Sequence, residues 1–249
     1  MILALLLLQD VVFEASPPHS DAEELRARFR NKELPGPYDV KKEKFRLYVP
    51  KSFAPAQKWG LLVYINPDGG AGLPAGYEAV LEKRKLLGVS PYKAGNERNA
   101  YDRFRLAIDA GYNMHLRYKV DPERVYVAGF SGGGRIASML GVAYADLFAG
   151  AIPLCGVNFY TDIPSEAGKH WPRNYIPVDE ALKIAKTSSR FALVTGEKDM
   201  NLANTRAVFE HGFKKEGFAR AELLVVPGLG HAPPSPADFA KALDVLDRR

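Results

Sequence analysis

The chain has 249 residues, of which 47% are hydrophobic and 25% are charged. These ordinary globular proportions argue against intrinsic disorder, a collagen-like repeat or a coiled coil, and the length suits one α/β domain with a substantial core. The formal net charge is +5, but the basic residues are dispersed rather than clustered among aromatic residues. That distribution argues against a nucleic-acid partner.

The first 19 residues are expected to be a leader or an atypical signal segment. Residues 2–8 form an apolar run of the minimum length for a signal-peptide core, but no Lys or Arg precedes it and no clear cleavage site follows. The run is too short to span a membrane, so we expect no stable membrane insertion. An export signal here would make the protein secreted or periplasmic; without one it is cytoplasmic.

Residues 20–37 are expected to form a short charged helix, at about residues 21–32, followed by a linker. Ser20 and Glu23 have the spacing of a capping box at the start of this helix, and the sequence PGP at residues 35–37 ends it. This segment therefore separates the leader from the rest of the chain.

Strands and helices alternate along residues 38–249, which we interpret as a single domain. Residues 45–49 alternate between apolar and polar side chains, as a half-exposed edge strand does, whereas residues 60–65 are continuously apolar, as a central parallel strand covered on both faces is. Further strands are expected at residues 86–89, 125–130, 149–154, 191–195 and 221–226. Helices are expected at about residues 97–117, 132–145, 179–188, 201–217 and 235–248. The alternation predicts an α/β fold with a single doubly wound, mostly parallel sheet and no large lid domain.

One segment interrupts this alternation. Residues 156–177 are rich in proline and aromatic residues and have no clear period, and a long loop inside a compact domain is usually functional. The segment follows an expected strand, which places it at the carboxyl edge of the sheet, where open α/β folds bind ligands. Phe159, Tyr160 and Trp171 are therefore candidate substrate contacts; the alternative is that they pack the loop itself.

Residues 129–133 (GFSGG) fit the pattern G-x-S-x-G and lie between an expected strand and an expected helix. This is the strand–turn–helix setting of a nucleophile elbow, in which small flanking residues allow a turn so sharp that the serine hydroxyl is exposed beyond the sheet. Ser131 is therefore the candidate nucleophile. The amide of Gly132, at the N-terminus of the following helix, is a candidate oxyanion donor.

A nucleophilic serine needs a base, and in this topology the acid and then the histidine come later in the chain. His231 follows the last expected strand, and Asp199 follows the strand before it. We expect His231 to act as general base and acid, and Asp199 to fix the tautomer of its ring. Glu197 lies on the same short loop as Asp199 and is the competing candidate.

The second oxyanion donor is expected in the glycine-rich loop after residue 65, where the amides of Asp68 and Gly69 are the candidates. The same loop contains GxGxxA at residues 70–75, a loose dinucleotide fingerprint. A dinucleotide site would have an acidic residue at the end of the next strand, but that strand ends in Gly-Val-Ser. We therefore expect no nucleotide cofactor.

Cys155 is the single cysteine and lies in an apolar run, so an internal disulfide is impossible and a buried structural role is expected. The five histidines lack the spacing of metal ligands. We therefore expect no metal site and no cofactor of any kind.

Residues 118–134 (YKVDPERVYVAGFSGGG) resemble the segment around the nucleophile in the α/β-hydrolase superfamily. The similarity is greatest to the branch that contains polyhydroxybutyrate depolymerases and feruloyl or acetylxylan esterases. It covers about residues 60–160 and elsewhere extends only to topology. The resemblance implies that residues 38–249 form an α/β-hydrolase catalytic domain.

The resemblance also implies that Ser131, Asp199 and His231 are a catalytic triad and that residues 66–70 are the oxyanion loop. This chain differs from members of that branch in two features. Its members usually carry His-Gly in the oxyanion loop, where this chain has Asn-Pro-Asp, and many secreted relatives have disulfides that this chain cannot form.

These features predict a serine carboxylesterase that works through an acyl-enzyme on small-molecule or polymeric esters, with short-chain, hydroxycinnamoyl and polyester substrates all in range. One alternative is a serine peptidase of the prolyl-oligopeptidase type, which shares the triad order but usually carries a large additional N-terminal domain. Another is a non-catalytic binding protein on the same fold, for which three intact triad residues have no physical use. The sequence specifies no oligomeric state.

Overall fold

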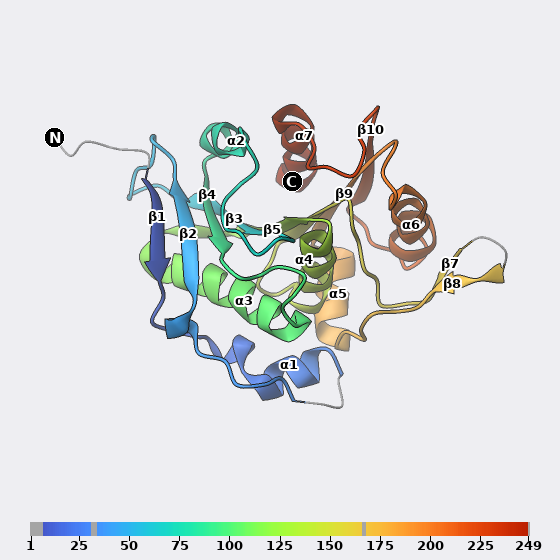
Figure 1. The fold of residues 1–249 in the computed structure, drawn as a ribbon, viewed down its shortest axis with the longest axis horizontal. Coiled ribbons are helices and arrows are strands. Elements are labelled where there is room, and N and C mark those ends of the chain that lie inside the picture. Colours follow the sequence, from blue (N-terminus) through green and yellow to red (C-terminus); the bar gives the residue numbers. More distant parts are fainter. Residues whose placement is uncertain (1–6, 31–33, 166–167, 249) are drawn as a thin grey trace.

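The centre of the molecule is an eight-stranded sheet, seen in a computed structural model that describes residues 7–30, 34–165 and 168–248 (Figure 1). Its strands are β1 (Leu7–Val12), β2 (Lys44–Val49), β3 (Trp59–Ile65), β4 (Leu86–Pro91), β5 (Val120–Phe130), β6 (Gly150–Leu154), β9 (Arg190–Gly196) and β10 (Ala221–Val226). They lie in the order β1-β2-β4-β3-β5-β6-β9-β10. β2 pairs antiparallel with β1 and β4, and the other pairings in this sheet are parallel. The predicted doubly wound, mostly parallel sheet is thereby confirmed.

Helices pack on both faces of the sheet (Figure 1). On one face lie α2 (Tyr77–Arg84) and α7 (Pro236–Asp247). On the other lie α3 (Ala100–Arg117) and α4 (Gly132–Ala143), with α5 (Asp179–Thr187) against α4. The shorter helices are α1 (Ala22–Arg28), the 3-10 turns Pro18–Ser20 and Val40–Lys42, and α6 (Leu202–Ala207), which continues as the π-helix Val208–Lys214.

Burial along the strands follows from their places in the sheet. All seven residues of β3, in the middle of the sheet, are buried, because helices cover both of its faces. All six residues of β10, at one edge, are only half-buried. Two hydrophobic clusters result, one on each face of the sheet.

The N-terminal segment belongs partly to this domain. The sequence places residues 1–19 outside the domain, whereas residues 7–12 are the edge strand β1 of its sheet. Asp10 of β1 forms ion pairs with Lys44 at 2.9 Å and with Arg46 at 3.0 Å. Most of the apolar run at residues 2–8 lies outside the described residues, and its role as a leader stays a prediction.

Two further elements have no counterpart among the sequence predictions. One is α2, which begins after Gly76 in a left-handed conformation (φ 83°) and buries only Tyr77, Val80 and Leu81 on the sheet. The other is a hairpin of β7 (Ile163–Pro164) and β8 (His170–Trp171), inside the segment that the sequence predicts to be a loop. This hairpin projects from the body of the molecule in Figure 1.

Candidate active site

Ser131 lies on a strained turn between β5 and α4. Its φ is 53° and its ψ is −116°, a backbone conformation that residues with a side chain rarely adopt. Glycines on both sides make the turn possible. A Cβ on Gly129 would lie 2.5 Å from the carbonyl carbon of Gly133, and a Cβ on Gly133 would lie 2.0 Å from the carbonyl oxygen of Ile65. The Ser131 amide donates to the carbonyl of Leu154 at 2.8 Å, so β3 and β6 together fix the turn.

The structure brings the three predicted triad residues together at the carboxyl ends of β5, β9 and β10. His231 Nε2 is 3.0 Å from Ser131 Oγ, and His231 Nδ1 is 2.8 Å from Asp199 Oδ1. Because an ionised carboxylate can only accept, Nδ1 donates its proton to Asp199 and leaves the lone pair of Nε2 directed at the serine hydroxyl. Glu197, the competing acid, is exposed and instead accepts from the amide of Gly228 at 2.8 Å.

Asp199 is buried but held in its ionised form. Burial by itself would raise its pKa, but hydrogen bonds from the Asn201 amide at 3.0 Å, from His231 and from the Thr195 hydroxyl at 2.8 Å outweigh that effect. These bonds hold the pKa of Asp199 below its ordinary value. At neutral pH the carboxylate is therefore a fixed negative charge beneath the imidazole.

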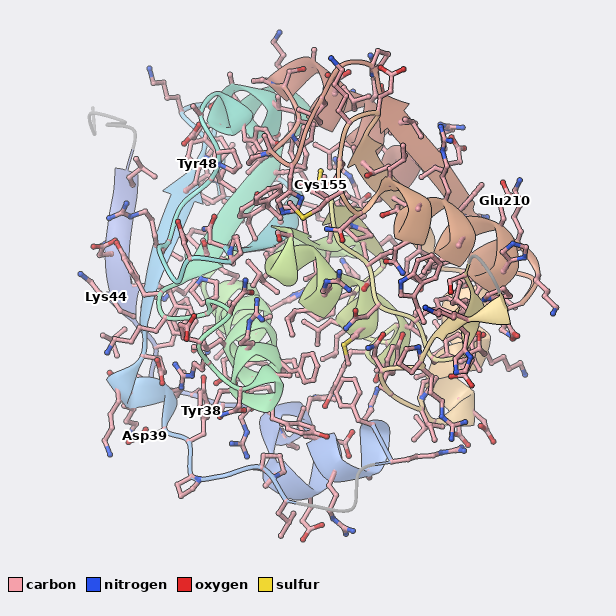
Figure 2. The ribbon with its side chains drawn as sticks, turned by 45° about the vertical axis from the view of Figure 1, so that its right-hand side comes forward. Tyr38, Asp39, Lys44, Tyr48, Cys155 and Glu210 are labelled. Atoms are coloured by element: carbon pink, nitrogen blue, oxygen red, sulfur yellow. The ribbon has the colours of Figure 1, made fainter. Side chains whose placement is uncertain are left out.

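Cys155 lies directly after β6, beside this carboxylate, and Figure 2 shows its sulfur near the middle of the view. Its Sγ is 3.5 Å from the carbonyl oxygen of Ala232, and its own carbonyl accepts from the side chain of Asn201 at 2.9 Å. Burial, with the neighbouring Asp199, raises the pKa of the Cys155 thiol to about 12. The thiol therefore stays protonated at neutral pH and is not a nucleophile there.

The predicted oxyanion donors lie on two facing segments. Gly132 is the first residue of α4, so its amide has no acceptor within the helix. Across from it, the amides of Asp68 and Gly69 have no acceptor among the residues that the structure describes. Gly69 packs against Gly95, where a Cβ would lie 2.5 Å from the nitrogen of Gly69. The same Cβ would lie 2.9 Å from the carbonyl carbon of Asp68, and which of the two amides is the second donor stays a prediction.

Comparison with solved structures identifies the fold. A thermophilic esterase, Est2, of Thermogutta terrifontis matches 84% of this chain and 87% of its own, with a TM-score of 0.58 at 19% identity. The chain has the α/β-hydrolase fold.

Two further likenesses cover a smaller share of the relative. The acylaminoacyl peptidase of Pyrococcus horikoshii matches 80% of this chain but only 37% of its own, with a TM-score of 0.58 at 16% identity. A stretch of 44 residues is 43% identical to poly(3-hydroxyalkanoate) depolymerase C of Paucimonas lemoignei, which amounts to 18% of this chain and 11% of that protein. No family model matches the chain.

Of the three aromatic residues predicted to contact substrate, two are buried and one is half-buried. Phe159 and Tyr160 are 2% and 8% exposed, and their rings contact each other. Phe159 also packs on Phe213 and Phe218, with ring centroids 4.9 and 6.0 Å away. Trp171 is half-buried in β8. These contacts are those of the alternative reading, in which the aromatic side chains pack the loop, and a role in substrate binding stays a prediction.

A cleft of about 640 Å³ lies beside the predicted oxyanion loop, residues 66–70. The loop contributes Asp68 and Gly69 to its wall, and the segment after β4 contributes most of the rest. Its charged lining residues are Lys42, Glu43, Asp68, Lys93, Glu97 and Arg98. This cleft suits a polar part of a substrate better than an apolar one.

Two further features are absent from the residues that the structure describes. No helix among them is long and apolar enough to cross a membrane. No group of three or more His, Cys, Asp or Glu side chains in the same part of the chain is placed to hold a metal ion.

Arg135 is a site residue that sequence reasoning missed. It lies four residues after Ser131 on α4, and its guanidinium donates to Asn158 Oδ1 at 3.0 Å and Asn201 Oδ1 at 3.3 Å. Burial lowers the pKa of Arg135, and the nearby Asp199 opposes this effect. The hydrogen bond to Asn201 connects α4, the helix that follows Ser131, to the loop that carries Asp199. The spacing of Arg135 from Ser131, one helical turn, is the only signal in the sequence.

Proposed function

We propose that this protein is a serine hydrolase that cleaves carboxylic esters through a covalent acyl-enzyme. The observation that carries the proposal is the continuous hydrogen-bonded chain from Ser131 through His231 to Asp199. It begins on a strained turn and ends on a buried carboxylate. Strain and a buried charge both cost stability, and they occur together where a nucleophile is being activated.

The chemistry follows from the positions of these groups. His231 Nε2 removes the proton of Ser131 as Oγ bonds to the ester carbonyl carbon, and the electron pair of the carbonyl moves to its oxygen. When this oxyanion collapses, the bond to the alcohol oxygen breaks and the alcohol takes the proton from His231. A water molecule then loses a proton to His231 and attacks the acyl group. The acid leaves, and Ser131 recovers its proton.

The largest contribution of the fold to the reaction is stabilisation of the oxyanion. We assign the amides of Gly132 and Asp68 as the oxyanion donors because neither has an acceptor among the residues that the structure describes, and the N-terminal end of α4 adds its positive dipole. Loss of one such donor typically costs about 10²- to 10³-fold in rate. Asp199 adds a fixed negative charge that stabilises the imidazolium formed in each half-reaction.

The substrate class is narrowed by the surroundings of the site. The hairpin of β7 and β8 projects away from the body, and the cleft beside the oxyanion loop is lined by charged side chains (Figure 1). We therefore place short-chain esters with a polar portion first. Hydroxycinnamoyl esters and polyesters follow, the latter because one short segment resembles a poly(3-hydroxyalkanoate) depolymerase.

The test is hydrolysis of p-nitrophenyl acetate and butyrate by the purified protein, together with labelling by a fluorophosphonate probe. We expect turnover and a single adduct at Ser131. Ser131→Ala abolishes both while the circular dichroism spectrum is unchanged, and Ser188→Ala, at an exposed serine of the same chain, alters neither. Wild-type protein that hydrolyses no ester and takes no adduct contradicts the proposal, and faster cleavage of a matched amide favours a peptidase.

A further inference from the structure

Asn96 is held beside the oxyanion loop by backbone hydrogen bonds. Its amide donates to the carbonyl of Pro67 at 2.8 Å, and the amide of Lys93 donates to the carbonyl of Gly69 at 2.8 Å. Between these bonds lies Gly95, where any side chain would collide with the nitrogen of Gly69. The segment after β4 is thus fastened to the oxyanion loop at two points, which fixes the backbone of Asn96.

The side chain of Asn96 extends from this anchor to the start of α4. A Cβ on Gly132 would lie 1.8 Å from Asn96 Oδ1, 2.7 Å from Cγ and 3.0 Å from Nδ2. The carboxamide therefore occupies the space against the residue that directly follows the nucleophile. Glycine at position 132 is what leaves room for it.

The carboxamide of Asn96 is also available to form a hydrogen bond. Asn96 is exposed, and its side chain has no hydrogen-bond partner among the residues that the structure describes. Rotation about the last side-chain bond exchanges its oxygen and nitrogen, so the NH₂ group can face the site. An unpartnered amide donor thus lies between Gly132 and the loop of Asp68, the two segments assigned to the oxyanion.

We propose that the Asn96 carboxamide is a third hydrogen-bond donor to the oxyanion, acting with the amides of Gly132 and Asp68. This inference rests on the proposed ester hydrolysis. A donor of this kind, carried by a side chain, stabilises the negative charge that develops on the carbonyl oxygen and contributes little to binding of the neutral ester.

The test compares Asn96→Ala and Asn96→Asp with wild-type protein on a p-nitrophenyl ester. Asn96→Ala removes the donor, and kcat falls about 10²-fold with KM within twofold of wild type. Asn96→Asp keeps the shape but replaces the donor by a negative charge, so kcat falls at least as far. Asn99→Asp is the matched control, because Asn99 caps α3 through the amide of Asp102 and aspartate caps equally well. Its kcat stays at the wild-type value.

A role in packing alone gives a different result. Asn96 is exposed, so truncation of a merely structural side chain leaves kcat of Asn96→Ala within threefold of wild type, and that outcome overturns the inference. A loss confined to KM overturns it as well. An independent readout is the inhibition constant of an alkyl boronic acid, whose tetrahedral adduct carries the negative charge; we expect it to rise in parallel with the loss of kcat. If wild-type protein is active and Ser131→Ala is not, failure at Asn96 leaves the proposed function intact.

Discussion

His231 Nδ1 lies 2.8 Å from Oδ1 of Asp199, a carboxylate whose side chain has no exposed surface. The same carboxylate accepts from Thr195 and from the amide of Asn201, so its oxygens are held from three directions. A carboxylate held in this way cannot rotate with the imidazole. It therefore fixes both the orientation and the tautomer of the ring that faces Ser131.

Replacing the acid tests this relationship directly. In Asp199→Asn the side-chain amide takes the place of an oxygen that accepts from Nδ1, which favours the tautomer with the proton on Nε2. We expect kcat for ester hydrolysis to fall by about 10³- to 10⁴-fold. The measurement is steady-state kinetics, with circular dichroism to show that the fold is kept.

Glu197→Gln is the matched control for this variant. Glu197 lies two residues from Asp199, but it is exposed and bonds to the amide of Gly228 rather than to His231. We expect its kcat to stay within twofold of wild type. If Glu197→Gln instead loses the activity and Asp199→Asn keeps it, the assignment of the acid is wrong.

The turn at Ser131 makes a prediction about stability. A methyl group on Gly133 would lie 2.0 Å from the carbonyl oxygen of Ile65, which is the backbone of a buried strand and cannot move aside. We expect Gly133→Ala to lower the free energy of unfolding by about 2–4 kcal/mol, measured by urea denaturation. Ester hydrolysis falls as well, because the turn that carries the nucleophile shifts.

The control for this substitution is Gly36→Ala. A Cβ on Gly36 has nothing within 4 Å, so the same methyl group is added without a collision. We expect its free energy of unfolding to stay within about 0.5 kcal/mol of wild type. Equal stability of the two variants would show that the turn has room to relax and that its strain is not imposed by β3.

The sheet and the meeting of Ser131, Asp199 and His231 at one of its edges could be predicted from the sequence for one reason. Central parallel strands such as β3 are continuous apolar runs, and their ends mark the edge where ligands bind. Once those ends are known, a serine after β5, an aspartate after β9 and a histidine after β10 must meet at one edge. Short-range patterns were therefore sufficient to predict this part of the site.

Contacts between segments that are far apart in the sequence could not be predicted from local patterns. β1 is a strand because it pairs with β2, some 37 residues later, whereas its first two residues belong to the apolar run that resembles a signal-peptide core. Asn96 meets Gly132 only because the segment after β4 is bonded to the oxyanion loop. The burial of Phe159 likewise depends on rings more than 50 residues away. No local pattern encodes these approaches.

Asp109 of α3 predicts an unusual dependence of stability on pH. Its carboxylate is fully buried and accepts from the hydroxyls of Tyr38 at 2.7 Å, Ser20 at 2.8 Å and Ser16 at 3.0 Å. Despite these hydrogen bonds, burial raises the pKa of Asp109 from 3.8 to about 6. Between those values the folded protein holds a proton that the unfolded chain has released. The contribution of Asp109 to the free energy of unfolding therefore falls as pH rises through this window and is constant above it.

The difference between 3.8 and about 6 corresponds to about 3 kcal/mol. Asp109→Asn removes this contribution, so we expect the stability of wild type relative to the variant to decrease by up to that amount between pH 4 and pH 7. Urea denaturation of both proteins at each pH measures the difference, in which the titration of all other carboxyl groups cancels. Asp21→Asn, at an exposed carboxylate, leaves the pH profile unchanged. A wild type that gains stability over Asp109→Asn as pH rises would mean that the three hydroxyl donors outweigh burial and hold the pKa of Asp109 below its ordinary value.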